Sequence, residues 1–231
     1  MNTEIITDWR TLNLQSLDIL LCSGNGKMSQ QIQWLQRMRG FVSPAADISH
    51  VAFVITLPDI VAEVLNTAIS PSGIYVCETT TLNSWAEPPK KGLQVNDFKR
   101  WLDNYNGSVW ARQISNRAIG LQYHTEIMRF VVNHLRDPHA QKYENGIPGL
   151  YELTMCMFGF KKALLNTAKL HCTEWDAEVE REFKVLGGTV SGNRLPPNEW
   201  WPTVCKKNGT CRPSLLDQQA LVKIGEPKRI K

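Results

Sequence analysis

One cysteine of the chain stands where a nucleophile is favoured. Cys172 falls in the first turn of a helix that the sequence predicts from His171, with Glu174 beside it. A helix N-terminus carries about half a positive charge, which favours the thiolate over the thiol. Because the thiolate is the attacking species, this position suits nucleophilic catalysis. The alternative is that Cys172 is a small buried apolar residue, as free cysteines often are.

A nucleophilic cysteine needs a base and a group that orients the base. His50 heads the strongest strand pattern in the chain, on the same face as Ala52 and Val54. Glu78 ends another alternating apolar segment, where an unpaired carboxylate is costly to bury. If the two strands are neighbours, Glu78 can accept a hydrogen bond from His50 and fix the tautomer of its ring. The alternatives are a structural core histidine and a strand-end carboxylate that reaches water.

The elements that would position these residues are mainly strands first and helices later. Alternating apolar residues predict strands at 17–21, 48–56, 61–65, 73–79 and 109–114. Helical spacing predicts helices at 29–39, from a cap at Asn96, at 121–135, and from His171 to a stop at Gly187. Because strands precede helices rather than alternating with them, the expected fold class is α+β.

Four short motifs occur in an informative order. They are Asp18-Ile-Leu-Leu, Ser49-His50-Val-Ala-Phe-Val, Tyr75-Val-Cys-Glu78-Thr and His171-Cys172-Thr173-Glu174. Together they resemble the circularly permuted NlpC-type papain-like cysteine hydrolases, a superfamily with several viral members. That family usually has Gly-Asp-Ile-Leu, Ser-His-Val, a strand ending Glu-Ala, and Cys-Ser-Glu at a helix start. Here Leu17 stands in place of the glycine and Thr173 in place of the serine, and the match covers roughly residues 15–205.

The resemblance implies a papain-like antiparallel sheet with the nucleophile at the N-terminus of a helix packed on it. It assigns Cys172 as nucleophile, His50 as base and Glu78 as orienting group. It also places Tyr143, which precedes Glu144, in the cleft near the oxyanion. It implies no cofactor and no metal.

A hydrolase of this kind cleaves an amide or ester bond through an acyl-thioester on the cysteine. A cysteine peptidase or amidase is the favoured interpretation. One alternative is a lipid acyl-hydrolase or acyltransferase with the same triad. The other is a non-catalytic module, a viral structural or binding protein, that retains the fold.

Length and composition restrict the remaining possibilities. The 231 residues are treated as a single domain, with an insertion at about 80–118 and a mobile C-terminal tail at about 225–231. A net charge of +4 is too small for a protein that coats nucleic acid. No apolar run approaches the roughly 18 residues of a membrane span. The expected partner is therefore a peptide, amide or acyl-lipid substrate.

Cysteine usage suggests a reducing compartment. The chain has six cysteines, and its N-terminus lacks the pattern of a signal peptide. Free thiols are then expected, in the cytoplasm or, for a virus-encoded protein, in a viral factory or virion. Cys205 and Cys211 are accordingly predicted to be free, and a disulfide across their short loop is the less favoured alternative.

Overall fold

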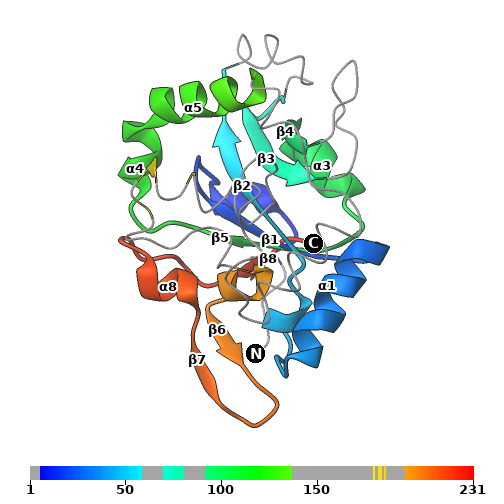
Figure 1. Cartoon of the computed structure of the whole chain (residues 1–231). Coiled ribbons are helices and arrows are strands. Elements are labelled where there is room, and N and C mark those ends of the chain that lie inside the picture. Colours follow the sequence, from blue (N-terminus) through cyan, green and yellow to red (C-terminus); the bar gives the residue numbers. More distant parts are fainter. Residues whose placement is uncertain are drawn as a thin grey trace.

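The computed structural model describes residues 6–58, 70–80, 92–136, 179, 182, 183, 185 and 196–231. These residues confirm the α+β class: a six-stranded antiparallel sheet has the order β4-β3-β2-β1-β5-β8 (Figure 1). Its strands are β1 Ile19–Gly24, β2 His50–Thr56, β3 Ile74–Thr80, β4 Gly92–Asp97, β5 Gly107–Arg112 and β8 Lys228–Arg229. A separate hairpin consists of β6 Thr203–Cys205 and β7 Cys211–Pro213. The strand predicted at 61–65 and most of the helix predicted from His171 lie outside the described residues.

Helices cover both faces of the sheet. The α-helices are α1 Lys27–Met38, α3 Phe98–Asn104, α4 Arg117–Gln122, α5 His124–Arg136 and α8 Leu215–Gln219. Three short 3-10 helices are η1 Trp9–Leu12, η2 Ala45–Asp47 and η5 Pro197–Trp200. Figure 1 shows α5 at one end of the molecule and the β6–β7 hairpin projecting from the other. In the part of the chain that the model describes, no helix is long and apolar enough to cross a membrane.

The central strands β1 and β2 are buried on both faces, because each carries apolar residues at nearly every position. Ile19 and Leu21 contribute to a larger core with residues of α5 and η5. Leu20 and Cys22 contribute to a smaller core with residues of η1 and α3. A strand with a continuous apolar run is typical of such two-sided burial. The site described below lies on the face of the smaller core.

Leu17 adopts an unusual backbone conformation directly before β1. Its φ is 74°, in the left-handed region that glycine adopts at little cost. Its side chain is completely buried, and its N–H donates to the Val54 carbonyl at 2.9 Å. Burial of the leucine side chain in the larger core offsets the backbone strain at this position.

Two predicted helix caps differ from the structure. Helix α1 begins two residues before Ser29, at Lys27, and its N-cap is Gly26. Helix α3 is capped by Asp97, whose carboxylate accepts from the Arg100 N–H at 2.7 Å, and not by Asn96. In both places the sequence offers more than one residue with capping ability within a few positions, and the backbone path selects between them.

The segment expected as an insertion at about 80–118 is part of the sheet wherever the structure describes it. Strand β4 pairs with β3, and β5 pairs with the central strand β1. Between them, α3 packs Phe98, Trp101 and Leu102 into the smaller core. The helix predicted from Asn96 and the strand predicted at 109–114 are both present, and β4 is a further strand of this segment.

The segment at about 225–231, expected as a mobile tail, is part of the folded structure. Strand β8 pairs with β5 and forms the edge of the sheet. Ile230 is buried in the smaller core, and the Lys231 ammonium donates to the carbonyls of Leu102 and Asp103 at 2.7 and 2.9 Å. Pro227 and the late charges suggested mobility, whereas the buried Ile230 and the strand pairing hold the segment in place.

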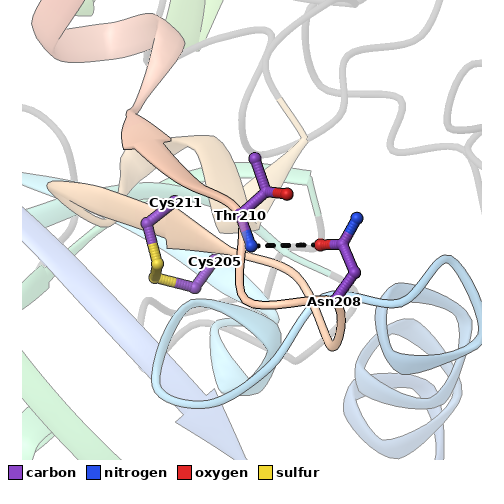
Figure 2. Close-up of a disulfide and its surroundings, with 4 residues drawn as sticks. All are labelled: Cys205, Asn208, Thr210 and Cys211. Carbon is purple, nitrogen blue, oxygen red and sulfur yellow. Dashed lines mark hydrogen bonds between the residues drawn. A yellow bond between two sulfur atoms is a disulfide. The ribbon is translucent and has the colours of Figure 1, made fainter.

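A disulfide joins Cys205 and Cys211, so the prediction of two free thiols is wrong. The two residues lie directly opposite each other in the β6–β7 hairpin. Figure 2 shows this bond beside the turn of the hairpin, where the Asn208 side chain accepts from the Thr210 N–H at 3.1 Å. The hairpin register brings the two sulfur atoms together, which a compartment argument cannot reveal.

Candidate active site

The position of His50 is fixed by its neighbour Ser49. The Ser49 N–H donates to the Cys22 carbonyl at 2.9 Å, and its hydroxyl donates to the same carbonyl at 3.3 Å. The Gly24 N–H in turn donates to the Ser49 hydroxyl at 3.1 Å. These bonds join the end of β1 to the start of β2, where His50 lies opposite Cys22. The result is a half-buried imidazole at a rigid strand end.

Glu78 and His50 form the hydrogen bond that the sequence predicts for neighbouring strands. Strands β2 and β3 are antiparallel, and their register continues to a diagonal placement of the two residues on one face. The His50 Nε2 lies 2.7 Å from Glu78 Oε2. The Glu78 side chain is only 5% exposed, so it does not reach water as the alternative required. A buried carboxylate is costly without partners, and the bond to His50 supplies one.

Trp101 is a third member of the group, and sequence reasoning missed its polar role. Its indole Nε1 donates to Glu78 Oε1 at 3.0 Å. In the structure Phe98, Trp101 and Leu102 form the buried face of α3. A buried tryptophan usually finds an acceptor for its N–H, and this was the signal available in the sequence. Each oxygen of Glu78 therefore has its own donor.

A cavity of about 420 Å³ opens beside this group, within the usual range for small-molecule sites. It lies between the N-terminal turn of α1, the ends of β2, β3 and β4, and helix α3. Most of its described lining side chains are polar, and Met28 and Ile32 are the aliphatic ones. The lining residues are Gly24, Gly26, Lys27, Met28, Ser29, Ile32, Ser49, His50, Glu78, Thr80, Gln94, Asn96, Trp101, Asn104, Tyr105 and Asn106.

Gly24 allows the wall of the cavity to close over the end of β1. A Cβ built at this position would lie 2.5 Å from the Ser29 hydroxyl and 3.1 Å from the Tyr105 hydroxyl. A side chain at residue 24 would therefore displace two polar groups that line the cavity. The glycine turn after β1 thus shapes the site, together with the Ser29 and Tyr105 hydroxyls.

The four residues expected at the site fall into two pairs. The structure brings His50 and Glu78 together beside the cavity. Cys172 and Tyr143 lie outside the described residues. Among the residues that the structure describes, no group of three or more His, Cys, Asp or Glu side chains has the arrangement of a metal site.

The pair of His50 and Glu78 can hold and orient a proton. With Nε2 bonded to Glu78, Nδ1 is the ring nitrogen that could exchange a proton with another group. The carboxylate can stabilise the imidazolium that forms when Nδ1 takes a proton.

No protein-family model matches the sequence. A search of the curated proteins finds no significant match.

Proposed function

We propose that the chain is a thiol hydrolase with a permuted papain-like fold, which cleaves an amide bond through an acyl-thioester on Cys172. In this proposal His50 Nδ1 takes the thiol proton and returns it to the leaving amine, while Glu78 orients the ring. The backbone N–H of Cys172, at the N-terminus of the helix that the sequence predicts from His171, would help to hold the oxyanion. Water then attacks the thioester, which releases the carboxylic acid and restores the Cys172 thiol.

The bond between His50 and Glu78 is the observation that carries this proposal. A buried carboxylate paired with a half-buried histidine at the rim of a cavity is the geometry of an oriented base. The same pair elsewhere in a core would be a structural ion pair. Its place beside a cavity of about 420 Å³ favours a role in chemistry.

The backbone at Leu17 supports the family resemblance independently. Leu17 stands where the family usually has glycine, and its φ of 74° is a conformation that suits glycine. The next residue, Asp18, is completely buried and holds the start of β1 through backbone N–H groups of Gln15 and Ile114. If the family glycine also adopts a positive φ, Leu17 meets the same backbone requirement with a different side chain.

The lining of the cavity favours an amide substrate over a long acyl chain. An acyl chain would be expected in a tunnel of aliphatic side chains, whereas this cavity combines an apolar surface with amide and hydroxyl groups. Asn104 and Asn106 bring amide groups to the cavity, and the rings of Trp101 and Tyr105 offer apolar faces. We therefore infer a peptide or a similar amide as the substrate class.

Selective alkylation of Cys172 tests the proposal. Cys22 and Cys77 are buried, and Cys205 and Cys211 are joined, so the comparison reduces to Cys172 and Cys156. With iodoacetamide at mildly acidic pH, Cys172 is expected to react fast because its thiolate is stabilised. Peptide mapping of the wild type, with Cys172→Ser and Cys156→Ser as matched controls, measures the reaction. Equal slow labelling of both cysteines would contradict an activated nucleophile.

Replacing Tyr143 by phenylalanine should separate oxyanion stabilisation from thiol activation. If the hydroxyl donates to the oxyanion, its loss lowers acyl transfer by about 10²-fold, near 3 kcal/mol at most. Alkylation of Cys172 forms no oxyanion, so its rate should stay within about twofold. Release of nitrophenolate from p-nitrophenyl acetate and iodoacetamide labelling measure the two steps. A parallel fall in both rates would return Tyr143 to a structural role.

A further inference from the structure

We propose that the indole N–H of Trp101 holds one side-chain oxygen of Glu78 and so decides which atom of that side chain faces His50 Nε2, and with it the tautomer of His50. Trp101 is a positioning residue in this proposal, because it acts through Glu78 and not on substrate. The inference rests on the proposed function for its effect on activity. Its effect on the tautomer stands on the geometry alone.

The three side chains form a linear chain with one bond at each step. The Trp101 Nε1 donates to Glu78 Oε1 at 3.0 Å, and Glu78 Oε2 lies 2.7 Å from His50 Nε2. Trp101 and Glu78 are both almost completely buried, so bulk water does not compete for the central carboxylate. The two carboxylate oxygens therefore have separate and fixed partners.

An indole nitrogen can donate and cannot accept. Oε1 of Glu78 must consequently act as an acceptor, and it cannot carry a proton toward Trp101. An ionised carboxylate accepts at both oxygens, so His50 Nε2 carries the proton, and Trp101 decides which of the two oxygens faces the ring. A neutral ring with its proton on Nε2 keeps its lone pair on Nδ1, the nitrogen that the proposed mechanism uses as base.

An amide at position 78 exposes the control that Trp101 exerts. In Glu78→Gln the Trp101 N–H holds the amide oxygen, so the amide NH₂ faces His50 Nε2. That nitrogen must then accept, and the ring proton moves to Nδ1. The imidazole is left with the tautomer that cannot take the thiol proton. In a serine-protease triad the equivalent change costs about 10⁴ in kcat for this reason.

Removal of the indole N–H should release the amide. In Trp101→Phe/Glu78→Gln the oxygen of the amide is free to turn toward His50 Nε2–H, which restores the lone pair on Nδ1. The phenylalanine ring retains contacts with the neighbouring rings of Phe98 and Tyr105, whose centroids lie 6.4 and 5.1 Å from that of Trp101. The second substitution is therefore expected to rescue the first. A purely structural tryptophan would give the opposite result, an additional loss.

Nitrogen-15 NMR of histidine-labelled protein measures the tautomer directly. The His50 signals are identified by their absence in His50→Gln, since the chain has five histidines. In a Cys172→Ser background, where no thiol proton reaches the ring, we expect the proton on Nε2 with Glu78, on Nδ1 in Glu78→Gln, and again on Nε2 in the variant that also carries Trp101→Phe. An unchanged Nδ1 tautomer in the double variant, or Nε2 in Glu78→Gln alone, would overturn the proposal.

The rate of nitrophenolate release from p-nitrophenyl acetate gives the second readout. The expected order is wild type, Trp101→Phe, the double variant and then Glu78→Gln, with at least about tenfold recovery between the last two, a fraction of the loss that a wrong tautomer causes. A double variant slower than Glu78→Gln contradicts the proposal. If the tautomers switch as expected and no variant changes the rate, the Trp101 inference holds and the thiol-hydrolase proposal fails. If the rates depend on His50 and the tautomer never switches, the thiol-hydrolase proposal holds and the Trp101 inference fails.

A second substitution covers the case in which Trp101→Phe disturbs folding. Site-specific replacement of Trp101 by benzothienylalanine keeps the size and shape of the indole and exchanges only the N–H for sulfur. In the Glu78→Gln background it should give the same tautomer switch and rescue. Near-UV circular dichroism confirms that each variant retains its packed aromatic core, and failure of this isosteric variant to rescue would overturn the inference.

Discussion

Replacing His50 by glutamine is expected to slow acyl transfer from p-nitrophenyl acetate by about 10²–10⁴-fold, the usual loss when a general base is removed. Glutamine has no titratable group, so nothing accepts the Cys172 proton at neutral pH. The strand should tolerate the change, because His50 is half-buried at a strand end and its backbone pairs with Cys22. Initial rates of nitrophenolate release measure the effect.

The pH dependence of alkylation gives a sharper test of the same residue. A thiol without a partner has a pKa of about 8.5, so its labelling rate rises about tenfold per unit between about pH 5 and 8. We expect that slope for Cys172 in His50→Gln, and a nearly flat profile in the wild type. His134→Gln is the matched control, because His134 lies on α5 and bonds to the Phe130 carbonyl. Identical profiles for wild type and His50→Gln would remove His50 from the mechanism.

The sequence predicts the part of this site that depends on strand pattern. Alternation gives the faces of β2 and β3, and a buried carboxylate at Glu78 demands a partner on a neighbouring strand. These two facts are enough to bring His50 and Glu78 together once the strands are adjacent. The strand pattern thus accounts for the contact between His50 and Glu78.

The contribution of Trp101 could not be predicted in the same way. The helical spacing of α3 shows that Trp101 is buried, but the acceptor of its N–H depends on how α3 docks against β3. The disulfide between Cys205 and Cys211 likewise depends on the register of β6 and β7. Both contacts depend on the tertiary structure, and the spacing of apolar residues in the sequence does not reveal them.

The C-terminal segment illustrates a different error. Charge and a proline at 225–231 favour a mobile tail, but Ile230 finds a place in the smaller core once β5 offers an edge. The burial of Ile230 and the two residue pairs between β5 and β8 stabilise this segment, although its composition is typical of a tail. Edge strands are short and polar in many proteins, so composition distinguishes them poorly from tails.

Replacing Asp18 by alanine is expected to lower the free energy of unfolding by roughly 2–5 kcal/mol, because each buried donor left without an acceptor costs about 1–3 kcal/mol. The carboxylate is completely buried and accepts from the backbone N–H groups of Gln15 and Ile114 at 2.8 and 3.1 Å. It also accepts from the Arg117 guanidinium. Alanine would leave these donors without their acceptor. Denaturant unfolding measures the loss, with Asp103→Ala as a control because Asp103 forms an exposed pair with Lys99.

The pH dependence of stability tests the same carboxylate with a definite sign. Burial raises the pKa of Asp18 above its ordinary value of 3.8, although the bonds from Arg117, Gln15 and Ile114 partly oppose this. The folded protein therefore holds the Asp18 proton more tightly than the unfolded chain does. This contribution to stability is fully present below about pH 3.8 and is lost as the pH rises through the raised pKa. The stability of the wild type relative to Asp18→Asn, which cannot titrate, should fall from about pH 4 upward, and a rise would show that the bonds to the carboxylate outweigh its burial.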